Sequence, residues 1–114
     1  MEPVPLSERF DLMSDQMFWG KVFATKHDLV IAICDEELID KKLRIKKLEI
    51  KISKKFYGER TINDEATAVR MMERCTIGNL IGKRIVKLAE KNGFITKENI
   101  IFIGGIPHAQ FVKL

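Results

Sequence analysis

The sequence predicts an α+β fold, in which a small mixed or antiparallel sheet of about five strands packs against a pair of helices. Residues 18–23 and 29–34 are rich in β-branched and aromatic side chains, and residues 43–52 alternate apolar with charged side chains, which is typical of strands. Residues 64–91 carry apolar side chains at helical spacing, and residues 99–114 are extended in pattern. Because strands and helices are grouped rather than alternating, an α+β fold is favoured over repeated βαβ units.

The chain of 114 residues fits one domain. Residues 1–16 contain two prolines and no apolar period, so we expect a flexible N-terminal extension before a domain at residues 17–114. The sequence shows no membrane span and no secretory signal, which predicts a cytoplasmic protein. Cys34 and Cys75 have no zinc-ligand spacing, and we expect neither a metal nor a cofactor. Abundant Lys and Ile with only two Gln favour a thermophile source.

The first two strands form a predicted hairpin, because Lys26-His27-Asp28 between them has the composition of a turn. Residues 30–34 are continuously apolar rather than alternating. Such a run predicts a central strand that is covered on both faces.

The next segment, residues 41–55, holds eight of the 20 Lys and Arg residues but one of the 16 acidic residues. Apolar residues alternate with charged ones on both sides of Lys46-Lys47, where the phase slips by one position. A period of two predicts a strand, and the slip predicts a bulge or a tight turn. Phe56-Tyr57-Gly58 then ends the run.

Two helices follow in the prediction. Asn63 or Asp64 is a suitable cap for the first helix, and Thr76 for the second, which ends at Asn92-Gly93. The apolar residues of the second helix match the i, i+3, i+4 pattern, namely Ile77, Leu80, Ile81, Ile85, Leu88 and Ala89. Gly78 and Gly82 would then mark a close approach by another element to this helix.

The final segment begins with a predicted buried strand at residues 99–103. Gly104-Gly105 interrupts it with a tight turn or, less simply, with an anion-binding nest of backbone amides. Pro107 favours extended backbone, so His108 to Leu114 is expected to be the last strand.

The basic residues are candidate phosphate ligands for RNA. Lys83, Lys87 and Lys91 would form a ridge at spacings of four on the second helix, and Tyr57 could stack on an unpaired base. The alternative for residues 41–55 is a solvated edge strand that lysines protect from aggregation. The proposed phosphate contacts are Lys42, Arg44, Lys47, Lys51, Lys83 and Lys87.

The string Gly104-Gly105-Ile106-Pro107-His108 places an imidazole in a defined setting, with Gln110 on the same face of the strand. His108 has three candidate roles: catalysis, contact with a ligand or RNA, or a structural hydrogen bond. The second hypothesis for function is therefore a small-ligand-binding protein or an enzyme with a pocket at this turn. The sequence does not decide whether the protein is an enzyme. A third reading is an interaction subunit, including a homodimer, that pairs through an exposed strand edge.

Several strings in a fixed order carry a resemblance to a known family. They are Val30-Ile31-Ala32-Ile33-Cys34-Asp35-Glu36-Glu37-Leu38, Phe56-Tyr57-Gly58, Asn79-Leu80-Ile81-Gly82 and Gly104-Gly105-Ile106-Pro107-His108-Ala109-Gln110. Over about residues 17–114 the chain resembles the small archaeal proteins grouped as domain of unknown function 424. The resemblance implies an α+β domain in the cytoplasm and no established activity. It also implies a link to RNA or ribosome-associated proteins of translation. Glu59 departs from the pattern, where a second glycine is expected.

Overall fold

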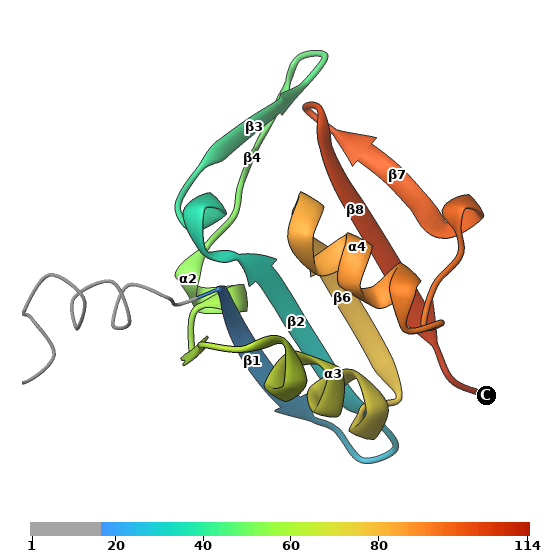
Figure 1. Cartoon of the computed structure of the whole chain (residues 1–114). Coiled ribbons are helices and arrows are strands. Elements are labelled where there is room, and N and C mark those ends of the chain that lie inside the picture. Colours follow the sequence, from blue (N-terminus) through green and yellow to red (C-terminus); the bar gives the residue numbers. More distant parts are fainter. Residues whose placement is uncertain (1–16) are drawn as a thin grey trace, which may run out of the picture.

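The computed structural model describes residues 17–114, so the predicted extension at residues 1–16 lies outside the described part (Figure 1). The strands are β1 (Phe18–Ala24), β2 (Leu29–Asp35), β3 (Lys42–Ile45), β4 (Leu48–Lys51), β5 (Arg60–Ile62), β6 (Ile77–Ile81), β7 (Ile100–Ile103) and β8 (Ile106–Val112). The α-helices are α2 (Lys54–Tyr57), α3 (Glu65–Arg74) and α4 (Lys83–Lys91), and two short 3-10 helices are η1 (Glu36–Leu38) and η2 (Lys97–Asn99).

The main sheet has six strands in the order β5-β1-β2-β6-β8-β7, and β3 and β4 form a separate two-stranded sheet. This is more than the five strands that the sequence predicted. β2 and β6 are parallel and the other neighbours are antiparallel, so the main sheet is mixed. The predicted hairpin is confirmed, because Ala24 of β1 pairs with Leu29 of β2.

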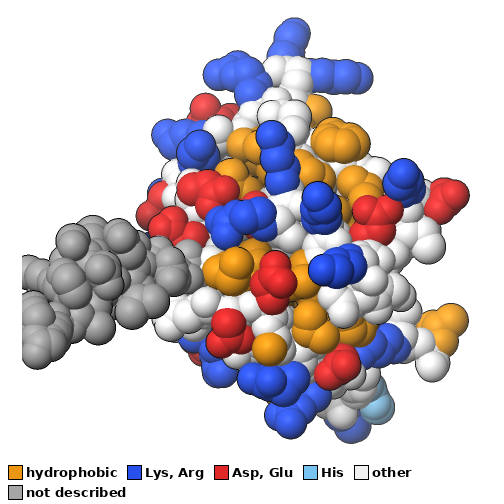
Figure 2. All heavy atoms as spheres, viewed as in Figure 1, with side chains coloured by type: hydrophobic (Ala, Val, Ile, Leu, Met, Phe, Trp, Pro, Cys, Tyr) orange, Lys and Arg blue, Asp and Glu red, His pale blue; other side chains and the backbone are white. Residues whose placement is uncertain are grey.

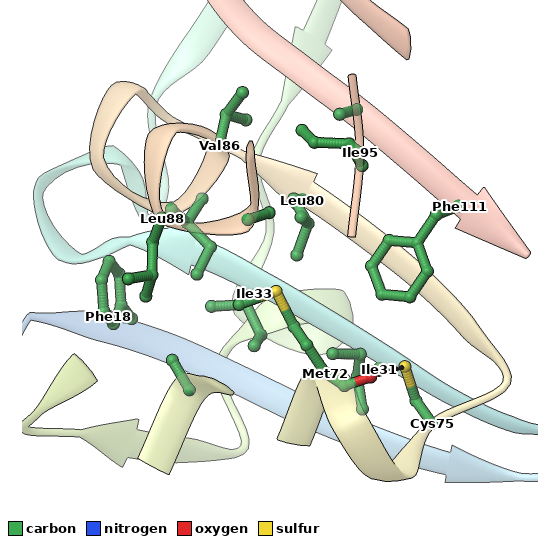
Figure 3. Packing of buried hydrophobic residues seen from close by; sticks show 14 of the residues in the cluster. Phe18, Ile31, Ile33, Met72, Cys75, Leu80, Val86, Leu88, Ile95 and Phe111 are labelled. Atoms are coloured by element: carbon green, nitrogen blue, oxygen red, sulfur yellow. Dashed lines mark hydrogen bonds between the residues drawn. The ribbon is translucent and has the colours of Figure 1, made fainter. Parts of the chain in front are cut away.

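One face of the main sheet is covered by α3 and α4, which lie in front of it in Figure 1. Side chains of both helices and of the central strands meet in the layer between them (Figure 3). Its large buried members include Phe18, Ile31, Ile33, Met72, Leu80 and Ile85. Asp64 caps α3 as predicted, since its side chain accepts a hydrogen bond from the amide of Thr67.

The opposite face is covered in part by the β3-β4 hairpin and by α2. A second apolar cluster lies there and joins Leu43 and Ile52 to Ala32, Cys34 and Ile81 of the sheet. The reversal between β3 and β4 falls at Lys46-Lys47, where Lys46 has a φ of 54°, so the predicted phase slip is a tight turn. Ser53 caps α2 through a hydrogen bond from the Phe56 amide. Neither α2 nor the short strand β5 was predicted from the sequence.

The predicted second helix is wrong over its first half. Residues 77–81 form strand β6, and only Lys83–Lys91 is helical. Thr76 does not cap a helix, because its hydroxyl accepts a hydrogen bond from the Leu29 amide and donates to Asp28. Gly78 does mark a close approach, but to a strand neighbour, since a Cβ there would lie 2.2 Å from the ring of Phe111. The pairing of β6 with β2 and β8 therefore overrides the helical pattern of its side chains.

The strand at residues 100–103 exists as predicted, but it is not buried. β7 is an edge of the main sheet, where the side chain of Ile101 is 56% exposed and that of Phe102 is 68% exposed. Gly104 and Gly105 have φ values of 56° and 83°, and they connect β7 to β8 in a tight turn. Within residues 17–114, no helix is long and apolar enough to cross a membrane.

Gly82 gives the first testable prediction. Its φ of 125° is rare for residues with a side chain, and a Cβ would lie 2.3 Å from the carboxyl carbon of Asp35. We expect Gly82→Ala to lower the free energy of unfolding by about 2–5 kcal/mol, measured by urea denaturation.

Gly93→Ala is the matched control. Gly93 also has a positive φ, of 81°, but nothing lies within 4 Å of the added Cβ. We expect this variant to lose only about 1–2 kcal/mol. Equal losses in the two variants would contradict a specific steric role of Asp35.

Candidate nucleic-acid interface

Helix α4 begins against a buried carboxylate at the end of β2. The side chain of Asp35 is 2% exposed, and its two oxygens accept hydrogen bonds of 2.9 Å from the amides of Arg84 and Ile85. Burial raises the pKa of Asp35, while these two amides and the Arg84 guanidinium act in the opposite direction. Asp35 thus satisfies two of the amides that the first turn of a helix leaves without an intrahelical partner.

Arg84 is held at this helix start by three groups. Its guanidinium forms an ion pair with Glu37, lies 3.9 Å from Asp35 Oδ2 and lies 5.5 Å from the ring centroid of Phe18. The Arg84 side chain is 42% exposed, so part of it faces solvent while these contacts fix its position.

A cavity of about 300 Å³ adjoins this start of α4. Lys41, which precedes β3, and Lys83, the first residue of α4, both line it. The remaining lining residues are Asp35, Glu37, Leu38, Arg84 and Ile106. The basic segment and the basic helix therefore meet here, although they are far apart in the sequence.

A second cavity of about 250 Å³ lies between α3 and α4, where Glu65 faces Arg84, Lys87, Leu88 and Lys91. Arg84 lines both cavities. We call the five cations along the two cavities the basic groove: Lys41, Lys83, Arg84, Lys87 and Lys91. Figure 2 shows Lys and Arg side chains spread over the face that carries α4.

The other predicted phosphate contacts do not line the groove. Lys42, Arg44 and Lys51 share the exposed face of the β3-β4 hairpin, opposite the face on which Leu43 packs. Arg44 lies 3.9 Å from Glu49, and Lys51 lies 3.9 Å from Asp40. Lys47 is exposed at the turn of the hairpin. These cations are separate from the groove and partly compensated by acidic neighbours.

His108 lies on the face of the sheet opposite α4, next to two other polar side chains. The Tyr57 hydroxyl donates a 2.8 Å hydrogen bond to Asn79 Oδ1, and His108 Nε2 lies 3.2 Å from the same oxygen. Gln110 is exposed and pairs with Asn79 across β6 and β8. We call Tyr57, Asn79, His108 and Gln110 the polar cluster.

The family described as "Protein of unknown function (DUF424)" matches residues 23–114. The chain belongs to this family. A crystal structure of an uncharacterized conserved protein from the archaeon Methanopyrus kandleri has a similar fold, with a TM-score of 0.73 and 22% sequence identity. The match covers 85% of this chain and 93% of that one. No curated protein matches the sequence significantly.

In this DUF424 protein the glycine turn does not join His108 in a single site. The turn packs against the β3-β4 hairpin, because a Cβ added to Gly104 would lie 3.3 Å from the backbone oxygen of Arg44. Pro107 is buried and alternates with His108 and Gln110, so it faces the helix side of the sheet. The structure therefore brings together only His108 and Gln110 from this predicted set.

The two cysteines are buried and free, and they belong to different apolar clusters. Burial raises the pKa of the Cys34 thiol to about 12, and burial also raises the pKa of Cys75. Both thiols are therefore protonated near neutral pH, and neither has the character of a nucleophile.

Sequence reasoning missed Lys41, Arg84 and Asn79 as site residues. The spacing of Lys83, Lys87 and Lys91 was visible in the sequence, and all three residues lie on α4. The sequence did contain one signal for the start of α4. Asp35 is an acidic residue directly after the apolar run at residues 30–34, and it is the residue that accepts the first amides of α4. Asn79 had no local signal, because its partners come from α2 and β8.

The environment of His108 gives a prediction on pH. Burial lowers the pKa of His108 below its usual value of 6.5. Between that value and the lower native pKa, the unfolded chain binds more protons than the folded protein, so stability falls as the pH decreases. We expect the free energy of unfolding to fall from pH 7.5 to pH 5.5 more steeply in the wild type than in His108→Gln.

Asp35 is unchanged in this comparison, so the effect of its raised pKa on stability cancels between the two proteins. The imidazole proton resonances of His108, followed by NMR, should titrate with a midpoint below 6.5. Parallel pH dependences in the two proteins, or a midpoint above that value, would refute this account.

Proposed function

We propose that this DUF424 protein binds RNA through phosphate contacts along the basic groove. The supporting observation is the position of Arg84, which lines both cavities and so joins Lys41 and Lys83 at one end to Lys87 and Lys91 at the other. A continuous row of cations on one face is the electrostatic signature of a surface that follows a nucleic-acid backbone.

The five cations of the groove outnumber its three acidic lining residues, Asp35, Glu37 and Glu65. In the part of the chain that the structure describes, none of its four lysines forms an ion pair. Such lysines attract counterions in solution, and a bound phosphate chain gains free energy because ions condensed on the nucleic acid are released. Arg84 differs because Glu37 holds its guanidinium, which makes it a fixed donor between the two cavities.

The chemistry of the groove defines the ligand class as phosphate chains, and RNA is our choice within it. A ribonucleoprotein of the translation apparatus is the partner implied by the resemblance described above. The groove has no cluster of Asn, Gln or Arg side chains arranged to read base edges, so we expect weak dependence on sequence. A solvated helix face without a ligand is the competing explanation, and salt dependence distinguishes the two.

The test uses Lys83→Ala, Lys87→Ala and Lys91→Ala together. These side chains are exposed, and alanine favours the helix, so we expect the triple variant to remain folded. The affinity for a fluorescent single-stranded RNA is measured by anisotropy across salt concentrations. Three lost phosphate contacts should weaken binding and make the slope of log affinity against log salt shallower by about 2.

A second triple variant, Lys26→Ala, Lys55→Ala and Lys97→Ala, removes the same charge from exposed sites outside the groove. We expect it to keep most of the wild-type slope. If the wild type shows no salt dependence, or if both triple variants lose the same affinity, the groove does not bind RNA phosphates.

A further inference from the structure

The polar cluster lies within a larger surface on the side of the sheet away from α4. We call this surface the open face and define it by Asn79 on β6, Ile101 on β7, and His108, Gln110 and Val112 on β8. The pairing of the strands places Gln110 opposite Asn79 and His108 opposite Ile101, so these residues are neighbours across three strands. Ile101 is 56% exposed and Val112 is 59% exposed.

The hydrogen bonds around Asn79 fix the direction of its amide. Tyr57 donates to Oδ1, and His108 Nε2 lies within reach of the same atom. These two interactions therefore fix the orientation of the amide group. Within residues 17–114, the amide nitrogen of Asn79 has no hydrogen-bond partner. It therefore has two N–H groups free to donate to a ligand.

The contact between His108 Nε2 and Asn79 Oδ1 also determines which ring nitrogen of His108 can accept a hydrogen bond. Because Asn79 Oδ1 only accepts, Nε2 must carry the proton that it shares with this oxygen. A neutral imidazole in this tautomer has an unprotonated Nδ1, which accepts a hydrogen bond. Burial favours the neutral form, since it lowers the pKa of His108. The face thus presents donors at Asn79, an acceptor at His108 and both kinds of group at the exposed amide of Gln110.

None of the five residues that define the open face carries a formal charge when His108 is neutral, in contrast to the basic groove. Exposed aliphatic groups of Ile101 and Val112 flank its donors and acceptors. This combination suits a neutral, flat ligand with hydrogen-bonding atoms on its edge, and it does not suit a phosphate or an acidic peptide. Nucleobases have these properties, and sheet surfaces are a common platform for unpaired bases.

We propose that the open face binds an unpaired nucleobase, with Asn79, His108 and Gln110 hydrogen-bonded to its edge and Ile101 and Val112 in contact with its ring. Adenine is the best match, because the exposed Gln110 amide can pair with its adjacent donor and acceptor atoms N6 and N7, while the free N–H groups of Asn79 donate to a further acceptor on the ring. The site is separate from the proposed groove, since none of the residues that define the open face lines either cavity. The base belongs either to a free nucleoside or to an RNA strand.

Unphosphorylated nucleosides test this site without any contribution from the groove. Adenosine, guanosine, cytidine and uridine are titrated separately into the 15N-labelled protein, and amide resonances are followed by NMR. We expect adenosine to shift the side-chain amide signals of Asn79 and Gln110 and to saturate at the lowest concentration. Short oligoadenylate and oligouridylate form the second arm. Stronger binding of oligoadenylate than of both adenosine and oligouridylate would identify an RNA strand as the source of the base, since phosphate contacts in the groove are shared by the two oligonucleotides.

Gln110→Ala is the principal variant, because Gln110 is exposed and its loss should leave the fold intact. We expect it to weaken adenosine binding about fivefold or more. Asn63→Ala is the matched control, since Asn63 is an exposed amide on the loop before α3. It should bind adenosine as the wild type does.

The groove triple variant should also bind adenosine normally, which separates failure of this site from failure of the proposed function. The nucleobase site is overturned if no nucleoside shifts the open-face signals. It is also overturned if the shifts map to the helix side, or if Gln110→Ala and Asn63→Ala behave alike.

Discussion

The hydrogen bonds between Asp35 and the start of α4 are the constraint on which the rest of the arrangement depends. Asp35 ends the central strand β2, and its buried carboxylate accepts the amides of Arg84 and Ile85. The chain can approach this closely because Gly82 has no side chain and adopts a positive φ. These contacts fix where α4 leaves the sheet, and thereby place Lys83 beside Lys41 and the Arg84 guanidinium beside Glu37.

The fold was predictable where local signals decide the structure. The β1-β2 hairpin, the Asp64 cap and the turn at Gly104-Gly105 all follow from side chains within a few residues of the feature. The boundary between β6 and α4 was not predictable in this way. Residues 77–81 have apolar side chains at positions that fit a helix as well as a strand, and only their pairing with β2 and β8 decides between the two.

The residues of the candidate site also fall into two groups, those predictable from local spacing and those that depend on tertiary contacts. Lys83, Lys87 and Lys91 follow from helical spacing, because one element carries all three. The partners that make a groove of them, Lys41 and Arg84, depend on how α4 meets the chain before β3. The concentration of positive charge in residues 41–55 predicted that the cations of this segment form one phosphate-binding surface. Strand alternation instead turns Lys42 and Arg44 outward on the hairpin, and Lys41 alone lines the groove.

The groove and the open face are separate surfaces, but strand β8 connects them. Ile106, the first residue of β8, lines the cavity between Lys41 and Lys83. His108 follows two residues later on the same side of the strand, a rise of about 7 Å. A flexible single strand whose phosphates leave the groove at Ile106 would therefore have its next base near His108. Double-stranded RNA could not make this turn around the end of the sheet, because its bases remain paired and stacked. If both surfaces bind one molecule, that molecule must be single-stranded at this point.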